Sequence, residues 1–272
     1  MDKILLIKVD ELIGISLEDV IKNKIFRSIC KAITYPKCNL EIFKKRVNAL
    51  KKVGIDSLFF EGRTQIGNIC VLGKGTNSIV IKAFYKGEIT VLKVLRLDSP
   101  RNNLDMEARL LKLVSSEYRD YRIVPKIYLN SDWYLVMEHI SGKNINDFLN
   151  DDVYIMSKEE IKKLLTKIFF KAYLLDRLRI DHTELSRAKS HIIIEEDTYE
   201  PLFIDFESAK IKRKPHNLTS VVQAILIRHP SSEYLRDILS VSHHKIIKFL
   251  KTYSPTIEQE IFMYRLENFL KN

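Results

Sequence analysis

The segment "LGKGTNSIVIKAFYKGEITVLKVLR", residues 72–96, decides how the rest of the chain is interpreted. Its two apolar runs have the length and β-branched content of strands, and "YKGE" between them suits a tight hairpin turn. A glycine-rich stretch, "GKGTNS", stands before the first run. The segment therefore predicts a glycine turn, a strand, a hairpin, and a second strand that carries Lys93 within an apolar run.

The glycine-rich stretch has two interpretations that the residues leave open. Gly73 and Gly75 let the backbone approach an anionic ligand closely and expose N–H donors to phosphate. The same pattern is also typical of an ordinary tight hairpin. A Rossmann-type dinucleotide site does not fit, because it needs a helix after the glycines and here a strand comes next.

Lys93 is best interpreted together with the helix that comes after it in the chain. Strand alternation alone would place it on the wet face of a half-buried sheet. The alternative is a lysine that reaches across the sheet to phosphate oxygens, held by an acid. Helical spacing returns at 103–116 and places Glu107 fourteen residues after Lys93. The ordered set of glycine turn, strand lysine and helix glutamate is more specific than any one of its members.

Two acidic stretches stand in the second half of the chain. "RIDHTELSRAKSHIII", 179–194, carries Asp181 and Glu184 before an apolar strand, and "PLFIDFESAK", 201–210, ends a strand at Asp205. Both stretches would be polar surface if they stood alone. Together they suit metal-assisted phosphoryl transfer, in which one acid orients the attacking hydroxyl and another holds Mg²⁺.

The remaining pattern gives the layout. Amphipathic spacing predicts helices over 17–34 and 40–53, the second ended by Gly54. Two further strands contain "KIYLN" and "WYLVMEHI", and a capping box, "SKEE" at 157–160, opens a mostly helical half. The chain is thus predicted to be α+β, in three parts: a helical extension at 1–54, a β-rich lobe at 55–137 and an α-rich lobe at 138–272.

Composition narrows the class of protein. The 272 residues are 46% hydrophobic and carry a formal charge of +10, which argues against global disorder and favours anionic partners. The three cysteines, Cys30, Cys38 and Cys70, form no tight pair at metal-ligand spacing, so we expect neither a disulfide framework nor a zinc site, and a reducing, cytoplasmic compartment. Apolar runs stay below about 18 residues, so no membrane span is expected.

Read in order, these pieces resemble the protein-kinase fold from about Ile66 to Ala209. "GKGTNSIV" is similar to the glycine-rich loop, "VLK" to the strand-lysine motif, "LVMEHI" to the hinge and "IDFE" to D-F-G. The resemblance implies ATP bound with Mg²⁺. It implies these nucleotide-binding residues: Gly73, Gly75, Ser78, Lys93 with its partner Glu107, and the backbone of Glu138 and Ile140 at adenine. Asp205 would be the Mg²⁺ ligand.

The catalytic loop departs from the common kinase pattern. "HTELSRAK", 182–189, fits the RIO-type atypical form at His182, Leu185 and Ser186. Glu184 stands where the catalytic Asp belongs, and Lys189 stands where the Mg²⁺-binding Asn belongs. Protonated Lys cannot ligate a metal. Asp181 or His191 can substitute as ligand, or one metal suffices, and either Glu184 or Asp181 is the base.

The short tail and the loops resemble most closely a group of small predicted archaeal Ser/Thr kinases. The implied activity is ATP- and Mg²⁺-dependent phosphorylation of a protein Ser/Thr hydroxyl. One alternative is an inactive nucleotide-binding pseudokinase or scaffold on RNA or the ribosome, suggested by Lys189 and the basic run "KIKRK" at 210–214. A second is a small-molecule phosphotransferase, since choline-kinase relatives share "IDFE". The extension at 1–54 is either a brace on the β-rich lobe or a nucleic-acid-binding module.

Overall fold

The chain has a mixed α+β fold in a computed structural model that describes residues 4–187, without the side chain of Arg187, and 190–271. It divides into two compact units. The first comprises residues 1–109 with 126–139, and the second residues 110–125 with 140–272. In the described part of the chain, no helix has both the length and the apolar character that crossing a membrane requires.

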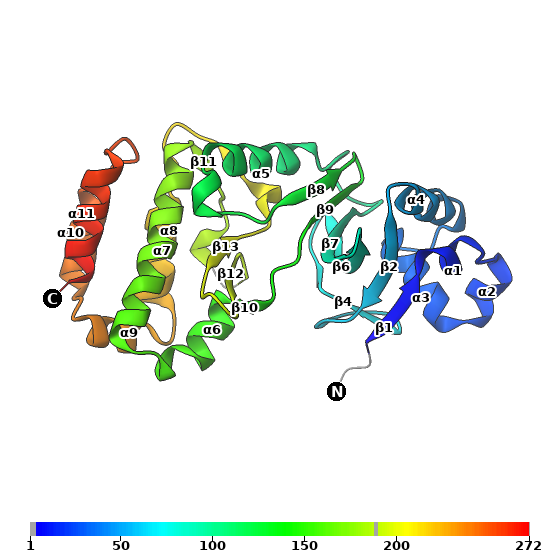
Figure 1. Cartoon of the computed structure of the whole chain (residues 1–272), viewed down its shortest axis with the longest axis horizontal. Helices are drawn as coiled ribbons and strands as arrows, with labels where there is room; N and C mark the ends of the chain where they lie inside the picture. Colours follow the sequence, from blue (N-terminus) through cyan, green and yellow to red (C-terminus); the bar gives the residue numbers. More distant parts are fainter. Residues whose placement is uncertain (1–3, 188–189, 272) are drawn as a thin grey trace. The chain divides into compact units, whose positions relative to one another are not determined.

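The first unit combines short N-terminal helices with antiparallel strands (Figure 1). Its elements are β1 (Leu5–Lys8), α1 (Val9–Ile13), α2 (Leu17–Lys22), α3 (Lys24–Ile33), α4 (Leu40–Lys52), β2 (Ile55–Phe60), β3 (Thr64–Ile66), β4 (Ile69–Val71), β5 (Gly73–Lys74), β6 (Ser78–Tyr85), β7 (Glu88–Leu95), the first turn of α5 (Asp105–Glu117), β8 (Ile127–Asn130) and β9 (Tyr134–Glu138).

A seven-stranded sheet forms the centre of this unit. Its strands run in the order β1-β2-β6-β7-β9-β8, with β5 paired to β6, and every pairing is antiparallel. The predicted β6–β7 hairpin is confirmed, and both of its central residues have positive φ, 49° at Lys86 and 88° at Gly87. Positive φ at both positions is the mark of the hairpin turns whose twist matches the strands.

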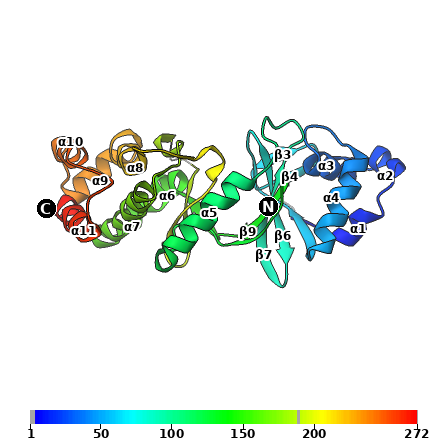
Figure 2. The same ribbon diagram turned by 90° about the horizontal axis from the view of Figure 1, so that it is seen from above.

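The N-terminal helices share a hydrophobic core with the sheet. Helices α1 and α4 contact β2. Helix α3 contacts β3 and β4, next to which it lies in Figure 2. Leu12, Ile33 and Phe43 are fully buried together with Ile79 and Ile81 of β6. Burying apolar surface in this way contributes about 25 cal/mol per Å². The first helices are therefore part of the hydrophobic core of this unit.

Local details differ from the sequence prediction at two places. The helix expected over 17–34 is broken at Asn23, which ends α2 and caps α3 by accepting from the N–H groups of Ile25 and Phe26. The strand β1 was not predicted. It pairs with β2 from Leu5 opposite Phe60 and forms an edge of the sheet.

The expectation that the cysteines do not form a disulfide is wrong for one pair. Cys30 and Cys38 are joined, with 5.0 Å between their Cα atoms, and Cys70 is free. The reason is the turn between α3 and α4, which reverses the chain so that residues eight apart in sequence face each other. Sequence spacing did not reveal this, since it carries no information on the direction of the Cβ atoms.

The second unit is mostly helical. Its elements are the rest of α5, η1 (Arg119–Tyr121), β10 (Gly142–Asn144), α6 (Ile145–Asp151), η2 (Val153–Ile155), α7 (Lys158–Arg177), β11 (Ile180–Asp181), η3 (Leu185–Arg187), β12 (Ile192–Glu195), β13 (Pro201–Phe203), η4 (Phe206–Ser208), β14 (Lys210–Ile211), α8 (Asn217–Gln223), η5 (Ala224–Arg228), α9 (Ser232–Leu239), α10 (His243–Lys251) and α11 (Gln259–Leu270).

Helix α7 is the centre of this unit (Figure 1). It begins at the predicted capping box, in which the Ser157 and Glu160 side chains each accept from the other's backbone N–H. It contacts α8, α9 and α11, and the rings of Tyr173 and Phe262 stack with centroids 3.9 Å apart. Two small sheets, β10-β12-β13 and β11-β14, carry the loops that hold the acidic residues.

Candidate functional site

In the first unit, the glycine turn lies between β5 and β6. Gly75 donates to the carbonyl of Ser78 at 2.9 Å, and Arg96 donates to the carbonyl of Gly75 at 2.7 Å. Gly73 does not have a positive φ, and a Cβ there would meet Val80 only at an ordinary 3.8 Å. Neither backbone conformation nor crowding therefore requires glycine at position 73. Close approach of a ligand to the backbone is another reason for a glycine at this position.

Lys93 and Glu107 form a buried ion pair. The Lys93 Nζ donates to Glu107 Oε1 at 2.9 Å, from β7 to the first turn of α5, and the two side chains are 4% and 2% exposed. The desolvation of such a pair can exceed its Coulombic gain, so a buried pair is weak evidence for stability. Such a pair on a strand that comes after a glycine turn in the chain is instead a reason to consider a functional site.

The other residues expected to contact a nucleotide lie at or near the ends of strands. Ser78 opens β6 and is buried. Glu138 ends β9, where its N–H donates to the carbonyl of Lys126 at 2.8 Å and its carboxylate accepts from the Lys126 N–H at 3.0 Å. A ligand contact through the Glu138 N–H would therefore compete with an existing hydrogen bond. Ile140 is buried and belongs to the second unit.

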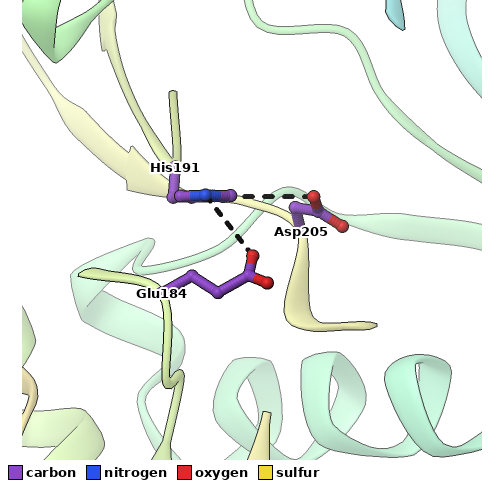
Figure 3. Close-up of side chains that lie close together, drawn as sticks. All are labelled: Glu184, His191 and Asp205. Atoms are coloured by element: carbon purple, nitrogen blue, oxygen red, sulfur yellow. Dashed lines mark ion pairs between the residues drawn. The ribbon is translucent and has the colours of Figure 1, made fainter. Parts of the chain in front are cut away.

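In the second unit, Glu184, His191 and Asp205 form a cluster (Figure 3). The His191 Nε2 lies 3.4 Å from Glu184 Oε2, and its Nδ1 lies 3.9 Å from Asp205 Oδ2. The Glu184 and Asp205 side chains are about one-third exposed, and that of His191 is 15% exposed. Each ring nitrogen of His191 therefore lies near a different carboxylate.

Hydrogen bonds between three loops assemble this cluster. The ring of His182 donates from Nε2 to the carbonyl of Ile204 at 2.8 Å, and Ile204 donates from its N–H to the carbonyl of His191 at 3.0 Å. Thr183 Oγ1 donates to the carbonyl of Ser208 at 3.2 Å. Burial lowers the pKa of His182, so its ring is a neutral structural group. These bonds link residues 182–183 to residues 204–208, and His191 to Ile204.

Thr183, which precedes a member of the cluster, and Asp205, which belongs to it, have unusual backbone conformations. Thr183 has φ of 70° and Asp205 has φ of 65°. Such values are costly for residues with a Cβ, and most of all for a β-branched one. Strain of this kind persists where the surrounding structure enforces it and gathers at functional sites. It supports a functional role for the loop ends that carry Glu184 and Asp205.

The structure separates the two acids between which the sequence could not choose. Asp181 is buried, and its carboxylate accepts from the Thr183 N–H at 3.1 Å and from Lys212 Nζ at 2.7 Å. It is not part of the cluster of Glu184, His191 and Asp205. Of these two acids, Glu184 therefore lies in the cluster, and Asp181 lies outside it with its carboxylate bonded to Thr183 and Lys212.

The cluster fits a divalent cation by its donor chemistry. One atom from each of the three residues lies within 4.8 Å of the other two. Two carboxylate oxygens and one imidazole nitrogen suit a first-row divalent cation such as Mn²⁺, and the carboxylates also suit Mg²⁺. Of the two substitute ligands that the sequence offered, Asp181 and His191, the cluster contains His191. Lys189 lies outside the described residues, and Glu207 is buried in η4.

The sequence named His191 only as a substitute ligand. Its position seven residues after Glu184, at the start of an apolar strand, was the available signal. The pairing of β12 with β13 brings it to Asp205, because Ile192 lies opposite Phe203. This is a contact between strands that no local pattern specifies.

Comparisons with known proteins add little about function. No family model matches the chain. An uncharacterized protein from Methanocaldococcus jannaschii is 27% identical over 121 residues, which are 43% of this chain and 95% of that protein. Since that protein is uncharacterized, the similarity indicates no activity for this chain.

Proposed function

We propose that the protein transfers the γ-phosphoryl group of ATP to a Ser or Thr hydroxyl of a protein, with a divalent cation, in the manner of RIO-like atypical kinases. The observation that carries the proposal is the buried ion pair of Lys93 and Glu107, which comes after a glycine turn along the chain. A lysine held by a glutamate in this order is the arrangement that binds nucleotide phosphates in kinases.

The first unit would bind the nucleotide. Lys93 would donate to the α- and β-phosphates, and Glu107 would fix the ammonium so that little side-chain entropy is lost on binding. The backbone N–H groups of the turn between Gly73 and Ser78 would approach the phosphates, where the lack of a side chain at position 73 leaves room.

The second unit would handle the transfer. Asp205 and His191 Nδ1 would hold the cation, which supplies charge neutralisation on the phosphates. Glu184 keeps one oxygen near His191 Nε2 and would use the other to accept the proton of the substrate hydroxyl. The pairing of Nε2 with a carboxylate would hold the ring in the tautomer that leaves Nδ1 free to ligate.

The test is phosphoryl transfer from radiolabelled ATP to the purified protein or to a generic protein substrate, with Mg²⁺ or Mn²⁺. We expect cation-dependent transfer by the wild type and none by Asp205→Ala. The matched control is Asp197→Ala, which removes an exposed aspartate from the turn between β12 and β13. Equal transfer by wild type and Asp205→Ala would contradict the proposal.

The same measurement separates the alternatives. A pseudokinase would bind ATP in a Lys93-dependent way without turnover, and a scaffold on RNA would show salt-sensitive RNA retention instead. Transfer to choline or an aminoglycoside, with none to protein, would favour the small-molecule phosphotransferase.

A further inference from the structure

The second unit contains a cavity of about 590 Å³ whose lining includes no residue of the Glu184, His191 and Asp205 cluster. It is bordered by the end of α7, by residues just before β11 and just after β14, by α8 and the segment before it, and by the turn after α10. Its volume lies within the range of sites that bind small ligands or side chains.

The cavity is lined by four exposed cationic side chains, Arg177, Arg179, Arg213 and Lys214. Arg177 lies in the last turn of α7, where a cation also stabilises the helix end, and it donates to the Tyr173 hydroxyl at 3.2 Å. Among the residues that the structure describes, no carboxylate pairs with Arg179, Arg213 or Lys214. Arg213 and Lys214 belong to no helix end, so helix capping does not account for them.

The small ribbon explains how these charges come together. Arg179, with φ of 59°, accepts at its carbonyl from the Lys212 N–H at 2.8 Å. This bond extends the pairing of β11 with β14 by one position, so Arg179 lies opposite Lys212, which precedes Arg213 in the chain. The Lys212 side chain is occupied by Asp181, at 2.7 Å. Within the basic run at 210–214, Lys212 is thus paired with Asp181, whereas Arg213 and Lys214 line the cavity.

Asp176 is the acidic residue of the lining, and its charge is already satisfied. Its Oδ1 accepts from the N–H and the side-chain amide of Asn217, at 2.9 and 2.8 Å. Its Oδ2 accepts from the Leu218 N–H at 3.1 Å and from the Tyr253 hydroxyl at 2.7 Å. The carboxylate is fully buried, so it leaves the exposed cations of the rim available to an anion.

We propose that this cavity binds the phosphate group of a phosphomonoester, carried by a phosphorylated Ser or Thr side chain of a protein partner. A dianion needs several cations around one point, and guanidinium groups bind phosphate oxygens in bidentate fashion. The hydroxyls of Thr219 and Thr256 add donors, and Leu250 and Pro215 add apolar wall for the carrier of the phosphate. Nucleic acid is expected to track along an extended basic stripe instead of a single recess.

The test is calorimetric titration of the full chain with three probes: O-phosphoserine, serine, and a single-stranded 12-nucleotide polyuridine. We expect one phosphoserine per chain and no serine binding. The double variant Arg213→Gln/Lys214→Gln should weaken phosphoserine binding by about tenfold or more, since bonds to charged groups are lost. The matched control Lys163→Gln/Lys248→Gln removes two exposed lysines of the same unit outside the lining. Thermal melts confirm folding, and both variants should melt with the wild type.

Several outcomes would overturn the proposal. These are the absence of phosphoserine binding by the wild type, equal weakening in both double variants, and tighter binding of polyuridine that depends on Arg213 and Lys214. The proposed phosphoryl transfer is tested separately. Asp205→Ala should bind phosphoserine as the wild type does, so the failure of one proposal leaves the other standing.

Discussion

Each unit contains a buried lysine paired with a glutamate, and the two pairs differ in their surroundings. Lys93 and Lys171 have side chains that are each 4% exposed. Lys171 is bound to the carboxylate of Glu200 and donates to the carbonyls of Arg122 and Pro201, both at 2.8 Å. These bonds join α7 to β13 and to the segment after η1. The Lys171 site is therefore a structural tie within the second unit.

Burial of a lysine beside a carboxylate therefore does not by itself indicate a ligand site. Burial lowers the pKa of Lys171 to about 8, with Glu200 opposing the shift, and yet its acceptors belong to the protein itself. Lys93 differs by its place in the chain, on a strand that comes after a glycine turn. The functional interpretation rests on that order, and variants of both lysines can break it.

The largest expected effect is on phosphoryl transfer by Lys93→Met. Loss of a donor to the phosphates should reduce kcat/KM by about 10³-fold, the upper end for removing one donor that acts on the transition state. The comparison partner is Lys171→Met, whose kcat/KM per folded molecule should stay within about twofold of the wild type. Radiolabelled-ATP kinetics at a temperature where both variants are folded measure this. Similar losses of kcat/KM in the two variants would contradict a functional role for Lys93 that Lys171 does not share.

The next effect is on stability. Lys171→Met should lower the free energy of unfolding by about 3 kcal/mol, because Glu200 and two buried carbonyls lose their shared donor. Glu200 keeps its bond to Lys167 at 2.6 Å, which limits the loss. Lys167→Met is the control, and since this lysine is half-exposed its removal should cost less than about 1 kcal/mol. Urea unfolding measures the free energy of unfolding of both variants. Equal losses would contradict a structural role specific to Lys171.

Sequence patterns predicted the features that depend on neighbours in the chain. The β6–β7 hairpin is encoded by "YKGE", and the pairing of Lys93 with Glu107 arises from a strand and a helix that are close in sequence. Lys171 was missed because in "KIFFKAYLL" a lysine at helical spacing is indistinguishable from a surface residue. Its burial depends on Glu200 and Arg122, which are distant in the chain.

The acidic residues show the same limit. Asp181 and Glu184 were equivalent in the sequence, because only the β11–β14 ribbon brings Lys212 to Asp181.

The disulfide between Cys30 and Cys38 likewise depends on the direction of a turn. Strand β1 was missed because a short edge strand before a helix has no second strand beside it in sequence to indicate a hairpin.

The buried carboxylate of Asp176 should make the stability of the protein depend on pH. Burial raises the pKa of Asp176 to about 6, against four hydrogen bonds that oppose the shift, from a reference value of 3.8. Between these two values the folded protein keeps a proton that the unfolded chain has released, so stability falls as pH rises. Relative to Asp176→Asn, the wild type should lose about 2 kcal/mol of unfolding free energy from pH 4 to pH 7. A difference that does not vary with pH would contradict this.

The smallest expected effect concerns the cation that we propose for Asp205 and His191. If His191 ligates through Nδ1, its imidazole should favour Mn²⁺ over Mg²⁺, because Mg²⁺ prefers oxygen ligands. His191→Asn supplies an amide oxygen and should shift the ratio of kcat/KM with Mn²⁺ to kcat/KM with Mg²⁺ toward Mg²⁺ by about tenfold. Calorimetric titration of the protein with Mn²⁺ alone should show the matching loss of affinity. His243→Asn, at an exposed position of the same unit, is the control. An unchanged metal ratio with unchanged Mn²⁺ affinity would contradict a ligand role for His191 and leave it, like Lys171, with contacts inside the protein alone.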